Sequence, residues 1–202
     1  MIIRHENKEP KIDETAYIAP NATICGDVTI GQGTRIMFGA QLIAESNPII
    51  IGDNCIVLEN AVIRAAAAGE LSIGNNCLIG PNSHLASCVI ENEVFIATGA
   101  SIFHGAKVRN GAEIRINAIV HLKTDFPENE VLPIGWIAVG SPMKMFSSKD
   151  HDEIWEIQKE LNFPDLVYGL RERQQLKSTN FELCKTMSKR LSSHLKDEII
   201  KR

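Results

Sequence analysis

The chain has 202 residues, of which 44% are hydrophobic and only 5% aromatic, and its formal net charge is −4. This length can bury one sizeable core, and the composition predicts that the core is aliphatic. The chain is acidic overall and has no run of 18 apolar residues, so we expect neither a nucleic acid nor a membrane as its partner.

The first ten residues, MIIRHENKEP, contain no apolar run of signal-peptide length, so we expect a cytoplasmic protein. An odd number of cysteines occurs, and none is part of a CxxC pair. This pattern favours buried thiols over a disulfide framework or a zinc knuckle. The cysteines are Cys25, Cys55, Cys77, Cys88 and Cys184.

From residue 18 to residue 120 an aliphatic side chain returns every six positions, apart from three breaks in the register. This period is typical of the hexapeptide-repeat parallel β-helix, an all-β solenoid in which three units close one triangular coil. The fifth residue of a unit is usually small, as at Ala22 and Ala61. We therefore expect one branched and one small side chain of each unit to point inward, in about six coils. The aliphatic positions are Ile18, Ile24, Ile30, Ile36, Leu42, Ile51, Val57, Ile63, Ile73, Ile79, Leu85, Ile90, Ile96, Ile102, Val108, Ile114 and Val120.

The breaks in the register predict loops. Three extra residues follow Leu42, four follow Ile63, and one residue is missing after Leu85. Insertions in a solenoid emerge on one face, which is often the binding face.

The hexads are last recognised at Leu122, and residues 127–146 are predicted to form an extended return strand. Ser147 and Asp150 then resemble a helix cap in front of HDEIWEIQKEL. We therefore place a repeat domain at residues 1–146.

A C-terminal helical extension is predicted at residues 147–202. Its second helix is expected at about 178–200, with an apolar stripe that packs on the prism or on a neighbouring chain. Residues 171–202 contain nine Lys and Arg against four Asp and Glu, which a solvated helix face explains. The stripe contains Cys184, Met187, Leu191 and Leu195.

The hexads, their breaks, GDVTIG at 26–31 and VGSPMK at 139–144 resemble the γ-carbonic-anhydrase-like branch of the hexapeptide-repeat proteins, over about residues 12–146. The resemblance implies a left-handed helix, because a six-residue period does not itself set the hand. It also implies a homotrimer with sites between neighbouring prisms.

The sequence departs from this family at the positions of its zinc ligands, so we expect no zinc chemistry of the family's kind. The three histidines that bind zinc in the active enzymes correspond to Arg64, Pro81 and Ala86. Arginine stays protonated, and the side chains of proline and alanine have no donor atom. An acidic residue of the family's site remains as Glu59. We therefore predict no metal ligands and no zinc cofactor. The family's supporting Arg, Asp and Gln correspond to Ala44, Ser46 and Leu58.

Three other histidines lie in the repeats. His84 falls between the positions of Pro81 and Ala86, and we interpret it either as a corner residue in contact with solvent or a neighbouring chain, or as a ligand-binding group. His104 and His121 lie in adjacent coils at different positions of their hexads, so we expect no metal site from this pair.

The segment EIRINAIVHL, residues 113–122, contains the candidate catalytic residues Arg115, Asn117 and His121. Arginine can hold a carboxylate or phosphate, asparagine can orient it, and histidine can move a proton. A polar edge between subunits explains the same residues. Arg64 with Glu59 likewise fits an anion clamp between chains or a structural salt bridge.

Three classes of function remain open. The first is a γ-carbonic-anhydrase-like homotrimer that binds a small anionic ligand or catalyses a divergent reaction through Glu59, Arg64, Arg115, Asn117 and His121. The second is an acyltransferase that uses acetyl-CoA, with His121 as general base, since fold alone does not fix function. The third is a non-catalytic assembly module that docks through its C-terminal helices.

Overall fold

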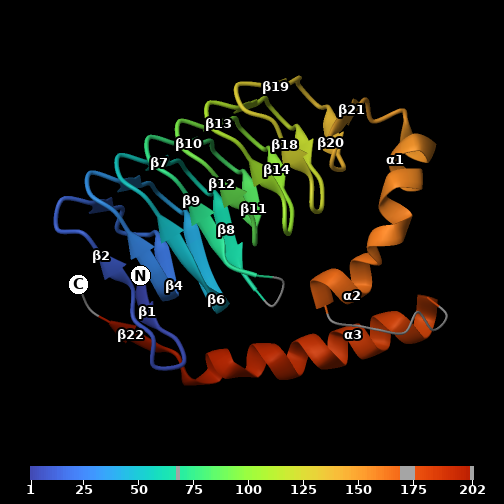
Figure 1. Cartoon of the computed structure of the whole chain (residues 1–202). Helices are drawn as coiled ribbons and strands as arrows, with labels where there is room; N and C mark the ends of the chain where they lie inside the picture. The colour runs from blue at the N-terminus through green and yellow to red at the C-terminus, as the bar shows by residue number, and fades with distance from the viewer. Residues whose placement is uncertain (67–68, 169–175, 201–202) are drawn as a thin grey trace.

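The computed structural model describes residues 1–66, 69–168 and 176–200, and it is an all-β solenoid followed by helices (Figure 1). The strands form three faces, and along each face neighbouring strands from successive coils pair in parallel. The parallel β-helix expected from the six-residue period is therefore confirmed.

Face one is a seven-stranded sheet of β3 (Tyr17–Ile18), β5 (Arg35–Ile36), β7 (Ile56–Val57), β10 (Leu78–Ile79), β13 (Phe95–Ile96), β16 (Glu113–Ile114) and β19 (Val131–Leu132). Face two comprises the first parts of β4 (Thr23–Ile30) and β6 (Gln41–Ile51), with β8 (Val62–Ala65), β11 (His84–Ala86), β14 (Ser101–Ile102), β17 (Ile119–Val120) and β20 (Ile137–Val139). Face three comprises β2 (Lys11–Ile12), the second parts of β4 and β6, β9 (Leu71–Ile73), β12 (Val89–Ile90), β15 (Lys107–Val108) and β18 (Asp125–Phe126).

The core is a stack of aliphatic layers inside the triangle. On face one, Ile36, Val57, Ile79 and Ile96 follow one another in register, and each is fully buried. Small residues such as Ala61 fill the remaining inward positions. Because each layer contacts the layers above and below it, truncating one of these side chains to alanine would cost about 3 kcal/mol.

The prediction that the hexads stop at Leu122 is wrong. Phe126, Leu132 and Ala138 continue the six-residue period, are fully buried, and lie in the parallel strands β18, β19 and β20. Face one therefore has seven strands, one more than the six coils expected. Of the predicted return strand, only β21 (Lys144–Phe146) runs antiparallel, against β20.

The first register break is a bulge at the end of face two. In the pair of β4 and β6, the register shifts between Gly26 and Val28, so the extra residues of β6 project from the ladder. Asn47 in this bulge donates a side-chain hydrogen bond to the carbonyl of Ala66, in the second insertion, at 2.6 Å. The two insertions thus emerge side by side, as expected, although residues 67–68 lie outside the described part.

The chain after the solenoid turns back along it (Figure 1). The predicted first helix is confirmed as α1 (His151–Gln158), preceded by hydrogen bonds from the backbone N–H and hydroxyl of Ser147 to the Asp150 carboxylate, both 2.8 Å. A short 3-10 helix η1 (Lys159–Leu161) and α2 (Phe163–Tyr168) follow.

The second helix is shorter than expected. It is α3 (Leu176–Leu191), followed by a 3-10 turn η2 (Ser192–Lys196) and by β22 (Glu198–Ile200). The strand β22 pairs antiparallel with β1 (Ile2–Arg4) and so brings the C-terminal segment to the first coil. Leu191 and Leu195 of the predicted apolar stripe are exposed. Among the helices that the structure describes, none has the length and apolarity required to cross a membrane.

Candidate functional site

Face two carries an outward column of side chains in successive coils. The register pairs Arg64 of β8 with Ala86 of β11. Phe103 and His121 continue this column, because the residues before them, Ile102 and Val120, are also paired. The first and last members of the column lie three coils apart, or about 14 Å at the usual strand spacing.

Arg64 is held by a carboxylate from the bulge of β6. Its Nε lies 3.0 Å from Oε2 of Glu45, and a terminal guanidinium nitrogen contacts the same oxygen. The Glu45 side chain is 2% exposed, whereas that of Arg64 is 37% exposed. The other oxygen, Oε1 of Glu45, is buried without a described partner. Within one chain, Arg64 therefore forms a structural ion pair with Glu45 and keeps part of its guanidinium accessible.

The positions that correspond to the family's zinc ligands lie at two different edges of the solenoid. Pro81 is at the corner between faces one and two, where the carbonyl of Glu59 accepts a hydrogen bond from the N–H of the neighbouring Asn82 at 3.0 Å. Arg64 and Ala86 lie at the far end of the face-two strands. Four residues lie between Pro81 and Ala86, and they comprise the turn at Asn82 and the start of β11, so the two positions are at opposite ends of this strand. One chain alone therefore does not bring these positions together.

His84, His104 and His121 lie on this side of the solenoid and are half-buried. The ring of Phe103 lies between two of them, with centroids 6.4 Å from His84 and 5.8 Å from His121. Burial lowers the pKa of His84, and the charge of Arg64 lowers it further. Burial also lowers the pKa of His104, assisted by His84 and Arg64.

Burial alone lowers the pKa of His121 to about 4. All three imidazoles are therefore neutral near pH 7, so they act there as hydrogen-bonding groups and not as cations. The Nδ1 atoms of His104 and His121 are buried without a described partner.

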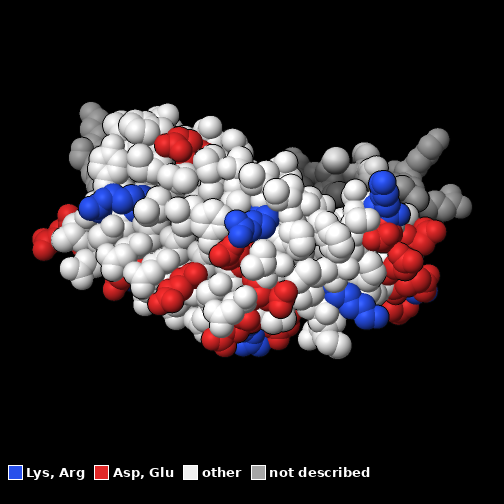
Figure 2. All heavy atoms as spheres, turned by 90° about the horizontal axis from the view of Figure 1, so that it is seen from above, with Lys and Arg blue, Asp and Glu red and all other residues white. Residues whose placement is uncertain are grey.

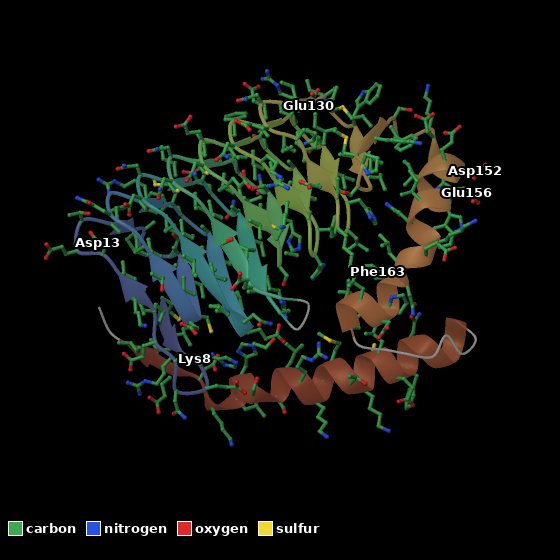
Figure 3. The ribbon with its side chains drawn as sticks, viewed as in Figure 1. Lys8, Asp13, Glu130, Asp152, Glu156 and Phe163 are labelled. Carbon is green, nitrogen blue, oxygen red and sulfur yellow. The ribbon has the colours of Figure 1, made fainter. Side chains whose placement is uncertain are left out.

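A pocket of about 310 Å³ adjoins His121, between the last coils and the C-terminal helices. His121, Trp155, Gln158, Lys159 and Phe163 contribute to its wall, and Figure 3 shows Phe163 where the helices come beside these coils. The Nε2 of Gln158 is, like Nδ1 of His121, buried without a described partner. The pocket therefore combines apolar walls with two hydrogen-bonding groups and the ammonium of Lys159, which forms an ion pair with Glu156.

The other predicted residues lie apart from this pocket. Arg115 follows face-one strand β16, and its terminal nitrogen lies 2.6 Å from a carboxylate oxygen of Glu113. Asn117 has a positive φ of 55° at the next corner, and its amide oxygen packs on Gly99. Among the described residues, no hydrogen bond or ion pair joins Arg115, Asn117 and His121. Within one chain, Asn117 is thus a turn residue.

Sequence reasoning missed two residues of this region. Glu45 lies inside the first register break, and this break was its only sequence signal. Gln158 lies on α1, and nothing in its sequence context distinguishes it from a solvent-exposed helical glutamine.

Comparisons with known proteins agree with the hexapeptide-repeat fold. Residues 71–104 match the model of the bacterial transferase hexapeptide (six repeats) family. The chain is 30% identical over 168 residues to γ carbonic anhydrase 1, mitochondrial, from Arabidopsis thaliana, over 80% of this chain and 59% of the plant protein. It is 28% identical over 159 residues to a carbonic anhydrase from Geobacillus kaustophilus, over 79% of this chain and 84% of that protein. The chain belongs to the γ-carbonic-anhydrase-like hexapeptide-repeat proteins.

The fold of this chain also resembles that of a solved structure. A Bacillus cereus protein provisionally assigned as an acetyltransferase is 27% identical and superposes with a TM-score of 0.60, over 79% of this chain and 91% of that one. The γ-carbonic-anhydrase-like chain described here therefore has the family's left-handed parallel β-helix. It spans 59%, 53% and 39% of the length of three plant relatives, the γ carbonic anhydrases 1, 2 and 3.

This γ-carbonic-anhydrase-like chain does not fit the family's zinc ion. At the three corresponding positions, a guanidinium already bound to Glu45, a proline ring and a methyl group offer no electron pair to a metal.

Proposed function

We propose that the protein is a homotrimer that binds a small anionic ligand in the pocket beside His121, without the zinc-dependent hydration of carbon dioxide. The observation that carries the proposal is the pocket itself. It places two buried nitrogen atoms that lack described partners, Nδ1 of His121 and Nε2 of Gln158, in wall residues next to the cation of Lys159.

The chemistry of the pocket favours a carboxylate or a similar anion. The amide of Gln158 can donate a hydrogen bond to oxygen, and so can an N–H of the Lys159 ammonium that its ion pair with Glu156 leaves free. A neutral His121 can donate one from its protonated ring nitrogen. Trp155 and Phe163 would cover the apolar part of such a ligand. A small rotation of the imidazole or of the Gln158 amide would give each buried nitrogen the partner that it lacks.

The outer surface of face one supports assembly with further copies of the same chain. Tyr17, Ile56, Phe95 and Val131 are exposed at equivalent outward positions of this face. The same column also contains Arg35, Leu78 and Glu113. Figure 2, which views the side of the molecule where β7, β10, β13 and β19 are labelled in Figure 1, shows wide uncharged areas with scattered charges. Several exposed apolar side chains on one face favour its burial in an interface.

A neighbouring copy would also bring Pro81 close to Arg64 and Ala86, which lie apart from it within one chain. The corner with Glu59 and Pro81 would then face the Arg64 and Ala86 edge of the next prism, which is the arrangement that the resemblance predicts. An ion pair between Glu59 and Arg64 across such an interface stays a prediction.

Ligand binding can be followed by the fluorescence of Trp155, after Trp136→Phe has removed the other tryptophan. Bicarbonate, acetate and inorganic phosphate would be titrated at constant ionic strength. We expect a saturable change with at least one of them, and about tenfold weaker binding in His121→Ala and in Gln158→Ala, which is the loss of one good hydrogen bond.

The matched control is His151→Ala, which removes an exposed histidine at the start of α1. It should bind like the parent protein. The absence of saturation with all three anions, or unchanged affinity in both pocket variants, would refute the proposal.

Acyl transfer is a second candidate, supported by the solved Bacillus cereus structure and by the apolar walls of the pocket. In this case His121 would accept the proton of an acceptor hydroxyl or amine as that group attacks the thioester carbonyl of acetyl-CoA. The carbon–sulfur bond would then break, and the same proton would pass to the departing CoA thiolate. Binding of acetyl-CoA that competes with the small anions, together with release of free thiol on adding an acceptor, would favour this candidate.

A further inference from the structure

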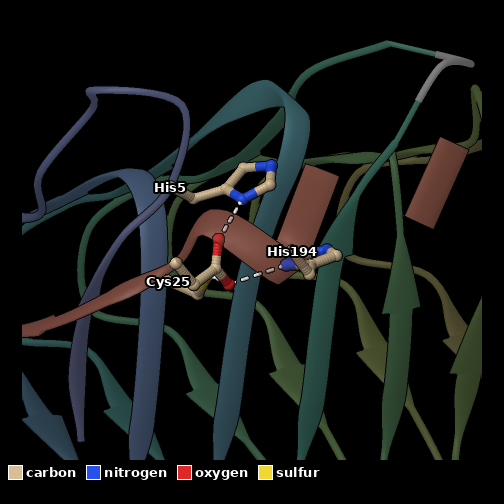
Figure 4. A group of neighbouring side chains, drawn as sticks. His5, Cys25 and His194 are labelled. Atoms are coloured by element: carbon tan, nitrogen blue, oxygen red, sulfur yellow. Dashed lines mark hydrogen bonds and ion pairs between the residues drawn. The ribbon is translucent and has the colours of Figure 1, made fainter. Parts of the chain in front are cut away.

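Four side chains with metal-binding atoms meet at the first coil, far from the pocket beside His121. His5 follows β1, Cys25 lies in β4, His194 lies in the 3-10 turn η2, and Asp197 precedes β22. One ligand atom from each of the four lies within 4.8 Å of every other (Figure 4). In the part of the chain that the structure describes, this is the only such group of three or more histidine, cysteine and acidic residues.

Asp197 is at the centre of the group. One carboxylate oxygen lies 2.6 Å from Nδ1 of His5, and the other lies 2.8 Å from Nδ1 of His194. The Cys25 sulfur lies 3.8 Å from the second oxygen. The two imidazoles are stacked, with ring centroids 4.3 Å apart. The donor atoms of all four residues are thus turned toward one another.

The backbone holds these residues in place before any ion binds. The parallel pair of β1 and β4 sets Ile3 beside Cys25. The antiparallel pair of β1 and β22 sets Arg4 beside Glu198, so His5 and Asp197 are the next residues on the two strands. His5 and Cys25 are 2% exposed, and Nε2 of His5 is buried without a described partner. Such a fixed arrangement lowers the cost of binding an ion.

We propose that His5, Cys25, His194 and Asp197 bind one zinc ion that joins the C-terminal segment to the first coil. Two imidazole nitrogens, one thiolate and one carboxylate oxygen are donors that zinc accepts in a four-coordinate site. A soft sulfur donor disfavours magnesium and calcium, which prefer oxygen ligands.

The charges and protons of the site balance. The thiol of Cys25 loses its proton to solvent, and each imidazole binds through Nδ1 while its proton resides on Nε2. A thiolate and a carboxylate together neutralise the two positive charges of zinc, so the buried centre carries no net charge. The side chains need to separate slightly, because donors bound to zinc at about 2.0–2.3 Å lie farther apart than hydrogen-bonded atoms.

This site is independent of the family's zinc position. It would act as a structural clamp, because all four positions are filled by protein and none is left for water or substrate. By fixing η2 and β22, it would hold the end of the chain against β1.

The test uses the full chain, purified without chelators, with the metal content measured by mass spectrometry and Co²⁺ as a spectroscopic substitute. We expect about one zinc per chain and, after exchange, the absorption of tetrahedral cobalt with a thiolate-to-cobalt charge-transfer band. Cys25→Ser should abolish the charge-transfer band, and His194→Ala should weaken zinc binding by at least about tenfold.

Two matched controls remove a similar side chain elsewhere. Cys88→Ser changes another buried thiol, and His151→Ala changes an exposed histidine. Both should keep the zinc and the charge-transfer band. If Cys25→Ser does not fold, the more exposed His194 provides the decisive variant. Metal-free wild-type protein that gives no charge-transfer band with Co²⁺, or zinc retained at full affinity in His194→Ala, would overturn the proposal.

Discussion

Ala86 lies directly beside Arg64 in the parallel strands β11 and β8, so the two neighbouring positions that correspond to zinc ligands in the family carry a methyl group and a guanidinium. The guanidinium is bound to the buried carboxylate of Glu45. An ion pair thus occupies the edge of the solenoid at which the resemblance places two of the family's zinc ligands.

A single histidine should not restore the family's zinc site. In Arg64→His the new imidazole would have Ala86 beside it and Pro81 at the opposite corner, and neither side chain can donate to a metal. We expect the zinc content per chain to equal that of the wild type, which includes any ion bound at Cys25. An additional equivalent of zinc in this variant would contradict the assignment of these positions.

Removing Arg64 should destabilise the fold, because it leaves the Glu45 carboxylate buried without its cation. We expect Arg64→Ala to lower the free energy of unfolding by about 2 kcal/mol. The double variant Arg64→Ala, Glu45→Gln should recover part of this loss, since no unpaired charge remains. Urea unfolding of the three proteins measures both effects, and equal stability of wild type and Arg64→Ala would refute the structural role of the pair.

The solenoid was predictable from the sequence because its inward layers repeat every six residues. The prediction ended too early because the signal changes at the last coils. Phe126 replaces a branched aliphatic residue, and Glu130 and Trp136 occupy positions that are small in earlier units. Parallel pairing with the coil below keeps these strands in register although their side chains differ.

The sites were less predictable, because they depend on contacts between distant segments. The spacing of hexads places Arg64 and His121 in one column, but it contains no information on the helices that cover His121. Likewise, no local pattern connects His5 and Cys25 with Asp197, since their meeting depends on β22 returning to β1.

Deleting residues 176–202 should leave the solenoid folded, because each coil is supported by its neighbours. The deletion removes β22, so the amides of Ile2 and Arg4, which face that strand, should exchange faster with deuterium than in the full chain. Amides in central strands such as β11 should remain protected. Loss of cooperative unfolding in the truncated protein would show instead that the C-terminal segment is part of the core.

Acid should destabilise the protein in part through His121. Its pKa is lowered in the folded state to about 4 from the usual 6.5, so the unfolded chain binds more protons between these values. The stabilisation is present above about pH 6.5 and is lost as the pH falls through about 4.

The midpoint of thermal unfolding of the wild type should therefore fall more steeply from pH 6.5 to pH 4 than that of His121→Gln. Carboxylates titrate in both proteins, so their contribution cancels in the difference. Identical pH profiles would mean that His121 is solvated in the folded protein.

The rate of carbon dioxide hydration by the purified protein, measured with and without added zinc, shows whether the family's zinc chemistry has been lost. Arg64, Pro81 and Ala86 provide no metal ligand. We therefore expect carbon dioxide to be hydrated no faster than in the absence of the protein, in both conditions and even when zinc is bound at Cys25. Zinc-dependent hydration above that rate, retained in Cys25→Ser, would contradict this expectation and would mean that other residues have rebuilt a catalytic metal site between the subunits.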